Sequence, residues 1–310
     1  MKVFKPEFWD KNYYTLLSLL LMPISLIYEF LFFLKKITIS PKKFKIPIIC
    51  IGNIYIGGTG KTPLAIKTYK ILKEINKNPV IIKKHYQNHK DEMLLLKNYS
   101  RFISSNKRSE GIIEAIEKKY DCVILDDGYQ DHEIKKDLNI ICFNSNQKLG
   151  NGQTLPSGPL RESPKSLKNC EIILVNGKKD LEFENKLKRY NKSLKFFYYT
   201  YSAKNLNEFK NKKLVAFAGI GNPENFFELL KLNYLNVVKE IRYPDHYEYT
   251  QKELDQLKDL EKEFKGKLIT TEKDYFRINP IFRKRVNFLP IKVELTDEQL
   301  FVREIKKYIQ

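Results

Sequence analysis

The chain has 310 residues, 42% of them hydrophobic, and carries a net charge of +19 from 56 Lys and Arg against 37 Asp and Glu. This hydrophobic share is enough for a packed core and excludes global disorder, and the length allows two modest domains. The basic excess suits an anionic membrane surface or a phosphorylated substrate. Nucleic acid is not expected as a partner, because the sequence has no Arg-rich block, zinc-finger spacing or RNA-binding aromatic motif.

Residues 16–34 form a long apolar segment, LLSLLLMPISLIYEFLFFL, in which Glu29 is the only charged residue. The segment has about the length needed to cross a bilayer, and lysines flank both ends, so charge gives no orientation. Three interpretations are open: a helix inserted in or lying on one leaflet, a full span, and a buried core helix. We favour the first, because the nucleotide site expected downstream requires a cytoplasmic location.

Residues 46–77 carry the strongest motif of the chain. An apolar run at 46–51 predicts a buried strand, a glycine-rich turn follows, and apolar residues at helical spacing begin after Pro63. Such glycines let backbone N–H groups converge on phosphate oxygens at a helix N-terminus, while Lys and Thr supply a cation and a magnesium ligand. A plain turn is the alternative, since Tyr55 stands where the strict pattern has glycine. The predicted phosphate-binding residues are Gly57, Gly58, Thr59, Gly60, Lys61 and Thr62.

Strand and helix patterns alternate in the next forty or so residues, as expected for an α/β sheet. The predicted elements are strands at 78–83 and 102–104 and helices at 91–97 and 109–119. Asp91 and Glu92 open the first of these helices. Carboxylates there complement the helix dipole, so both residues have a purely structural interpretation.

The second strong motif is residues 121–131, DCVILDDGYQD. Its apolar run ends in Asp126 and Asp127, as in a buried parallel strand whose carboxyl end reaches the ligand-binding edge of the sheet. A carboxylate at that edge can hold Mg²⁺ directly or through water. A simple turn is the alternative, but the phosphate motif nearby in the predicted sheet favours the metal site.

Further strands are predicted at 138–143 and 171–176, with a loop of about 25 residues between them. Loops of that length inside a compact domain are usually functional or disordered. The prolines and glycines of this loop, with Arg161 and Glu162 near its end, indicate a shaped part of the site. The four cysteines have no C-x-x-C spacing, which favours a reducing cytosolic compartment.

The aromatic segment 194–204 is interpreted as a connector between two domains. A second α/β unit is predicted after it from the same alternation of apolar runs and helical periodicity. Its strands are expected at 214–218, 237–242, 267–271 and 286–293, and its helices at 224–232, 251–264 and 296–308.

Taken together, the motifs resemble the tetraacyldisaccharide 4′-kinase (lipid A 4′-kinase) family over nearly the whole chain. The matching segments are GNIYIGGTGKTP (52–63), ILDDGYQDH (124–132), LPSGPLRE (155–162), FAGIGNPENFF (217–227), YPDHYEY (243–249) and TTEKDYFR (270–277). That family also lacks the leading glycine of the strict phosphate loop. The chain departs from it at 84–87, Lys-His-Tyr-Gln instead of Arg-Gly-Tyr-Gly, and at Asp131, which replaces a histidine.

The resemblance implies a P-loop NTPase-like α/β/α sandwich with a second, smaller α/β lobe. The expected divisions are a membrane-associated N-terminal helix at 1–40, a P-loop kinase domain at 41–200 and a smaller lobe at 201–310, whose final helix packs back on the first lobe. The implied enzyme is a monomer on the cytoplasmic face of the inner membrane. It transfers the γ-phosphate of ATP, with Mg²⁺, to the 4′-hydroxyl of an acylated glucosamine disaccharide 1-phosphate and forms lipid IVA.

The resemblance also implies the site residues, position by position. Lys61 would bind the phosphates beside Asp127. The metal would be held by Thr62, Asp126 and Glu162, and the substrate by Tyr86, Arg108 and Arg161.

The implied catalytic base is Asp91, with His246 of the second lobe as its partner once the lobes close. An ordinary turn histidine is the alternative for His246. Two other classes of function are open: a membrane-anchored P-loop ATPase switch or assembly factor acting on partner proteins, and a basic nucleic-acid-associated protein. The switch leaves the Asp91–His246 pair without a role, and the nucleic-acid protein leaves the carboxylate edge without one.

Overall fold

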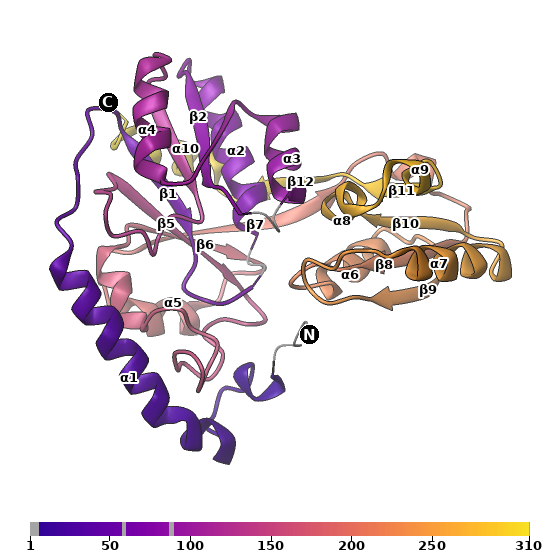
Figure 1. The fold of residues 1–310 in the computed structure, drawn as a ribbon, viewed down its shortest axis with the longest axis horizontal. Coiled ribbons are helices and arrows are strands. Elements are labelled where there is room, and N and C mark those ends of the chain that lie inside the picture. The colour runs from indigo at the N-terminus through magenta and orange to yellow at the C-terminus, as the bar shows by residue number, and fades with distance from the viewer. Residues whose placement is uncertain (1–5, 58–59, 87–89, 310) are drawn as a thin grey trace. The chain divides into compact units, whose positions relative to one another are not determined.

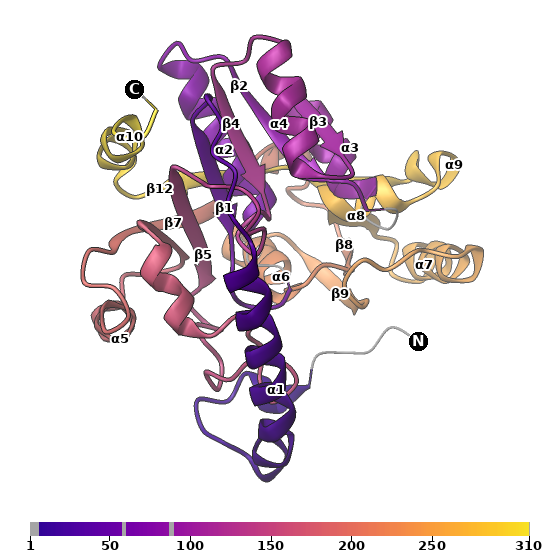
Figure 2. The ribbon, with the colours of Figure 1, turned by 60° about the vertical axis from the view of Figure 1, so that its left-hand side comes forward.

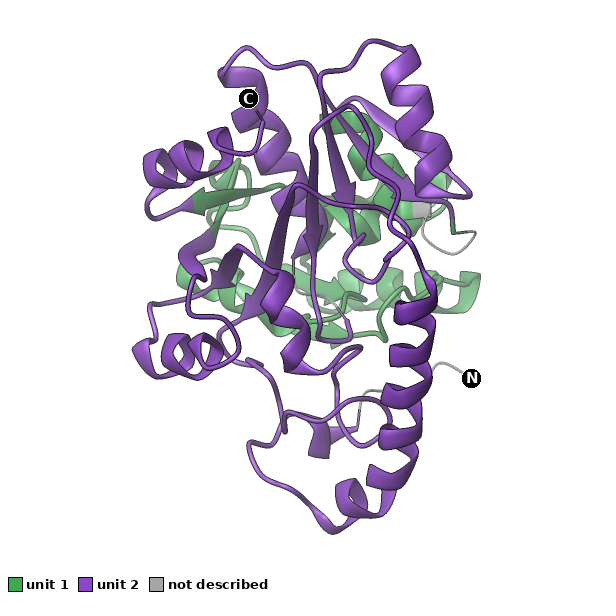
Figure 3. Cartoon of the chain, turned by 90° about the vertical axis from the view of Figure 1, so that its left-hand side faces the viewer, with its two compact units in different colours: residues 1–3, 86–99, 201–294 green, residues 4–85, 100–200, 295–310 purple. Residues whose placement is uncertain are grey.

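The computed structural model describes residues 6–57, 60–86 and 90–309, and its elements are labelled in Figures 1 and 2. The chain divides into two compact units (Figure 3). The larger unit takes the described residues within 4–85, 100–200 and 295–310, and the smaller takes those within 86–99 and 201–294. The chain therefore enters the smaller unit twice, at 86–99 and at 201–294, whereas the sequence suggested one boundary between the two lobes, at residue 200.

The larger unit is built on an eight-stranded sheet with the order β12-β7-β6-β5-β1-β4-β2-β3. The neighbours from β7 to β3 pair in parallel, and all five residues of β1 and of β4 are buried. Parallel strands covered on both faces give the continuous apolar runs seen in the sequence. The strands are β1 (Ile48–Gly52), β2 (Pro79–Lys84), β3 (Phe102–Ser105), β4 (Cys122–Asp126), β5 (Leu138–Asn144), β6 (Ile172–Asn176), β7 (Lys195–Ala203) and β12 (Ile291–Leu295).

Helices cover this sheet, with α2 packed over β1, β2 and β4 and α4 over β2, β3 and β4 (Figure 2). Two sequence interpretations were incomplete. The segment at 194–204 is not only a connector, because β7 pairs with β6 along the sheet, and the short helix α5 was not predicted. The helices are α1 (Leu16–Thr38), α2 (Lys61–Glu74), α4 (Arg108–Glu117), α5 (Leu181–Lys188) and α10 (Glu298–Lys306), with 3₁₀ turns at Glu7–Trp9 and Pro164–Asn169.

The first helix, α1, runs along the outside of the larger unit (Figures 1 and 2). Its polar side faces the protein: Ser157 donates its N–H to the buried Ser25 (2.9 Å) and its hydroxyl to the carbonyl of the buried Ser18 (2.6 Å). Thr154 likewise donates to Glu29 (2.9 Å). Only 11% of its most apolar 18-residue window is buried, so the apolar side chains lie on the outer side. The arrangement is the reverse of an ordinary surface helix.

The smaller unit has a four-stranded parallel sheet with the order β11-β10-β8-β9. The predicted strand at 286–293 is in fact two strands in different sheets, β11 in this sheet and β12 in the eight-stranded sheet, because Pro290 between them has no N–H to continue a ladder. The elements are α3 (Lys90–Tyr99), β8 (Leu214–Ala218), α6 (Glu224–Leu232), β9 (Val237–Arg242), α7 (Gln251–Glu263), β10 (Lys267–Thr271), α8 (Glu272–Arg277), α9 (Pro280–Arg283) and β11 (Val286–Leu289), with a 3₁₀ turn at Leu206–Glu208. The predicted class, α/β with parallel sheets, is confirmed.

Candidate active site

The phosphate motif lies between β1 and α2. Gly57 and Gly60 have φ angles of +97° and +81°, a backbone conformation that favours glycine, and Lys61 is the first residue of α2. Gly58 and Thr59 lie outside the described residues. Tyr55, at the position of the missing glycine, is buried and donates its hydroxyl to Asp10. In this loop a buried, hydrogen-bonded tyrosine therefore takes the place of the glycine.

The acidic edge meets this loop directly. The register of β1 and β4 places Ile51 beside Asp126, and Thr62 Oγ1 donates to Asp126 Oδ2 at 2.9 Å. Lys61 Nζ lies 3.7 Å from Asp127 Oδ1. Asp126 Oδ1 is buried and makes no hydrogen bond among the described residues. The sequence motifs around residues 61 and 126 therefore lie at one edge of the sheet, as expected.

Lys83, at the end of β2, is a site residue that the sequence reasoning missed. Its ammonium lies 2.6 Å from Asp126 Oδ2, and the two side chains are 3% and 0% exposed. In the β2–β4 register Lys83 is directly opposite Asp126. The available signal was a lysine closing an apolar strand, since a buried lysine is nearly always paired.

Two arginines expected to bind substrate hold the turn after β4. Arg161 Nη1 donates to both oxygens of Asp127, at 3.1 and 3.2 Å. Arg108 donates to the Asp127 carbonyl (2.6 Å) and to Asp131 (3.2 Å), the residue that replaces the family's histidine. Burial raises the pKa of Asp127, but Lys61 and Arg161 lower it more, so this pKa lies below its usual range. Asp127 is therefore an anion at neutral pH.

Glu162, predicted as a metal ligand, lies in a different environment. It is 3% exposed and its Oε2 lies 3.9 Å from Nε2 of His132. Burial raises the pKa of Glu162 to about 7, against the opposing effect of Lys36. The hydroxyl of Tyr28 in α1 donates to the backbone carbonyl of Arg161 (2.8 Å), so this corner is tied to the helix. The metal role of Glu162 stays a prediction.

The raised pKa of Glu162 makes the stability of the protein depend on pH in a direction that can be measured. In the unfolded chain the pKa of Glu162 is near 4.5, and in the folded protein it is about 7, so the folded state binds this proton more tightly. The folded protein therefore loses stability relative to the unfolded chain as the pH rises from about 4.5 to about 7. A Glu162→Gln variant should therefore gain stability relative to the wild type between pH 5 and pH 8, by about 2 kcal/mol. Denaturant unfolding at both pH values measures the change. The exposed-site control Glu117→Gln should change far less, and an equal change in both variants would contradict the assignment.

The predicted base and its partner lie together in the smaller unit. Asp91 in α3 is 2% exposed, and its Oδ2 lies 3.8 Å from Nδ1 of His246. Burial, with the positive charges of Lys273 and Arg277, lowers the pKa of His246 to about 4, although Asp245 raises it. His246 is therefore neutral at pH 7. The backbone φ angle of His246 is +56°, and its backbone N–H donates to the carbonyl of Gly219 (3.1 Å).

This corrects the expectation that lobe closure brings Asp91 and His246 together. The two residues belong to the same compact unit, because α3 packs on α8 through Asp91–Arg277 and Glu92–Lys273 ion pairs. These partners are more than 180 residues apart in sequence, so local periodicity could not reveal them. Tyr86, the remaining predicted substrate contact, is 43% exposed.

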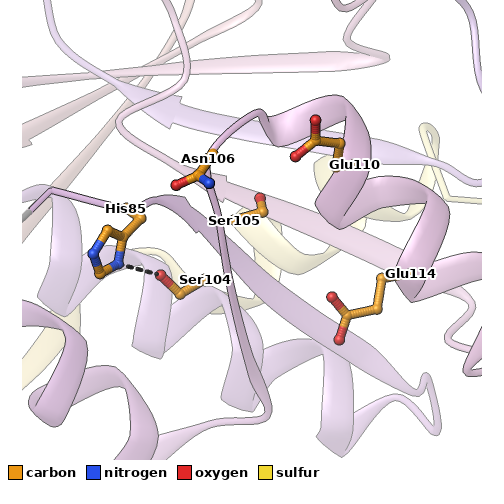
Figure 4. A pocket seen from close by; sticks show the side chains of 6 residues that line it. All are labelled: His85, Ser104, Ser105, Asn106, Glu110 and Glu114. Atoms are coloured by element: carbon orange, nitrogen blue, oxygen red, sulfur yellow. Dashed lines mark hydrogen bonds between the residues drawn. The ribbon is translucent and has the colours of Figure 1, made fainter.

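An open pocket with a volume of about 440 Å³ follows the ends of β2 and β3 (Figure 4). Figure 4 shows His85 hydrogen bonded to Ser104 (3.3 Å), opposite the carboxylates of Glu110 and Glu114 on α4. Carboxylates disfavour a phosphate, so this pocket is not a candidate for the nucleotide phosphates.

Comparison with known proteins gives one consistent result. The family model described as "Tetraacyldisaccharide-1-P 4'-kinase" matches residues 17–310. The chain is 41% identical to the tetraacyldisaccharide 4'-kinase of Pelagibacter ubique, over 99% of this chain and 98% of the relative, and 34% identical to that of Rickettsia felis, over 100% and 99%. A crystal structure of "apo" LpxK from Aquifex aeolicus in complex with ATP has the same fold, with a TM-score of 0.72 and 23% identity over 95% of this chain and 100% of that one.

Proposed function

The chain belongs to the tetraacyldisaccharide-1-P 4′-kinase family, and from this premise we propose that it transfers the γ-phosphate of ATP to the 4′-hydroxyl of a tetraacyldisaccharide 1-phosphate. The product would be lipid IVA. The main support for the proposal is that four side chains meet at one edge of the large sheet. There the cation and the hydroxyl of the phosphate loop contact two carboxylates, and the residues are Lys61, Thr62, Asp126 and Asp127. The relative from Aquifex aeolicus binds ATP, which supports ATP as the donor.

The oxygen donors at this edge suit Mg²⁺. Asp126 Oδ1 is buried without a partner among the described residues, and the Thr62 hydroxyl lies against the same carboxylate. Hard oxygen ligands of this kind are those that Mg²⁺ prefers. Thr62 and Asp126 would hold the ion, which when bound neutralises phosphate charge. Lys83 balances the Asp126 charge within the protein.

Phosphoryl transfer to an alcohol also needs an acceptor for the hydroxyl proton. In the proposed reaction Asp91 Oδ1 takes the proton of the 4′-hydroxyl, the sugar oxygen forms its bond to the γ-phosphorus, and the bond from that phosphorus to the β–γ bridging oxygen breaks, which releases ADP. Lys61 stabilises charge on the phosphates, while neutral His246 supports Asp91. Arg161, Arg108 and Tyr86 are proposed to serve the substrate side.

The proposal is tested by following labelled γ-phosphate from ATP to a tetraacyldisaccharide 1-phosphate. We expect label in the glycolipid product, and none when the acceptor is an analogue whose 4′-hydroxyl is methylated. Equal label in both acceptors would contradict transfer to this hydroxyl. Absence of label in either would contradict the kinase proposal. The family membership does not favour the alternative of an ATPase switch.

We further propose that α1 lies in the cytoplasmic leaflet of the inner membrane. Its outer surface is apolar and exposed, which in water is unfavourable. The bonds of Ser18, Ser25 and Glu29 to residues 154–157 keep polar backbone along one side of the helix. A full span would place that backbone in hydrocarbon, where irregular loops are not tolerated. The exposed side chains include Leu16, Leu17, Leu19, Leu20, Ile24, Leu26, Ile27, Phe30, Leu31, Phe33 and Ile37.

Flotation with vesicles of phosphatidylethanolamine and phosphatidylglycerol tests this placement. A Leu20→Glu, Ile27→Glu double variant should bind at least about tenfold more weakly than the wild type, because two exposed apolar contacts with lipid become charges. The control Leu232→Glu changes a side chain that is 76% exposed on α6 and should bind as the wild type does. Equal flotation of all three proteins would contradict the insertion of α1 in the membrane.

A further inference from the structure

Arg277 holds the predicted base at one oxygen only. Its Nε and Nη2 both donate to Asp91 Oδ2, at 2.9 and 2.5 Å, and both side chains are buried, at 7% and 1% exposure. Asp91 Oδ1 is also buried and makes no hydrogen bond among the described residues. A buried oxygen that is left unpaired destabilises the fold. A contact that served only to join α3 to α8 would gain by satisfying both oxygens, so the bare oxygen needs another explanation.

The guanidinium is itself fixed from the other side. Its Nη1 donates to Asp274 Oδ1 (2.9 Å) and to the carbonyl of Gly219 (2.5 Å). Asp274 is fully buried and accepts further bonds from the Gly219 N–H (3.0 Å), Thr271 Oγ1 (2.7 Å) and Tyr249 OH (3.0 Å). This framework of the smaller unit places Arg277 without help from Asp91. It can therefore set where the Asp91 carboxylate lies.

The other charges around Asp91 are largely occupied with one another. Lys273 Nζ lies 2.7 Å from Glu92 Oε1 but 3.9 Å from Asp91 Oδ2. His246 is neutral near pH 7, and Asp245 lies on its far nitrogen at 3.9 Å. Among the described side chains, Arg277 is therefore the cation nearest to Asp91, with Nη2 at 2.5 Å from Oδ2. The same Nη2 lies 3.4 Å from Nδ1 of His246.

We propose that Arg277 is a positioning residue for the kinase reaction: it holds Asp91 by Oδ2 and leaves Oδ1 to accept the proton of the acceptor hydroxyl. The inference rests on the proposed function, in which Asp91 is the base. It gives a role to the arginine that ends the segment TTEKDYFR (270–277), which had none. Removing Arg277 should free the Asp91 carboxylate to rotate, so that the oxygen that accepts the proton is no longer held in one place.

The test compares kcat with the KM for ATP in γ-phosphate transfer. In Arg277→Gln, kcat should fall by about tenfold or more while the KM for ATP stays within about twofold, because the base is displaced and nucleotide binding is not touched. Arg277→Lys keeps the charge and should restore part of kcat. Arg285→Gln removes an exposed arginine that pairs with Glu261 in the same unit, and both constants should match the wild type.

The Gln variant leaves buried Asp274 without its cation and can fail to fold. The double variant Arg277→Gln, Asp274→Asn removes both charges and should show the same fall in kcat with an unchanged KM for ATP. Folded variants whose kcat matches the wild type, or whose kcat and KM change together, would reduce Arg277 to a structural contact. A wild-type protein that transfers no phosphate would overturn the proposed function instead, so the two failures are distinguishable.

Discussion

An Asp91→Asn variant is expected to bind ATP as the wild type does and to lose phosphoryl transfer by about two to four orders of magnitude. The amide has nearly the shape of the carboxylate but cannot accept the proton of the acceptor hydroxyl. Single-turnover transfer and ATP binding by calorimetry, measured on the same preparations, separate chemistry from nucleotide affinity. The Asp91 carboxylate is paired with Arg277, so thermal unfolding of the variant is measured as well.

Asp255→Asn provides the matched control for this prediction. Asp255 lies on α7 in the same unit and accepts a hydrogen bond from the side chain of Gln251 at an exposed site. Its substitution should leave transfer unchanged. Turnover of the Asp91 variant within a few-fold of the wild type would exclude Asp91 as the base.

A Lys61→Ala variant should lose transfer by about two to three orders of magnitude and also bind ATP more weakly. Lys61 is 11% exposed at the first turn of α2, and its ammonium charge at the phosphate loop cannot be replaced by the helix dipole alone. The variant also takes one cation from Asp127, which keeps Arg161 as a partner. The same labelled transfer assay measures the loss.

Lys67→Ala is the control on the same helix. Lys67 is 12% exposed and pairs with Glu298 of α10 at 2.7 Å, so its removal tests the loss of a helix lysine away from the loop. Transfer by this variant should stay close to that of the wild type. Equal losses in the two variants would indicate damage to α2 rather than loss of a phosphate-binding cation.

The edge formed by residues 61, 62, 126 and 127 was predictable because each motif is local. Glycines before a helix and a carboxylate after an apolar run both report the end of a buried parallel strand, and such ends share one edge. Lys83 was not predicted as part of this edge, because its place there depends on the β2–β4 register, which pairs it with Asp126. Sequence patterns do not specify which residues of two strands lie opposite each other.

The surroundings of Asp91 were the least predictable part. Its helix was expected in the kinase domain, since it lies between two strands of the larger sheet, yet it belongs with residues 201–294. The ion pairs that draw it there join residues 91–92 to 273–277, and one sequence contains no record of such long-range contacts. The same limit applies to α1, whose polar inner side becomes meaningful only when Ser157 is seen bonded to it.

The most direct test is the ratio of ADP formed to phosphorylated glycolipid in a single turnover, with and without the tetraacyldisaccharide 1-phosphate. In a lipid kinase, the phosphate loop and the carboxylate base serve one transfer to an alcohol. We therefore expect one ADP for each phosphorylated acceptor and little ADP when the acceptor is absent. ADP released at the same rate with or without the glycolipid, and no phosphate in the lipid, would contradict it and identify the chain as a nucleotide-hydrolysing switch.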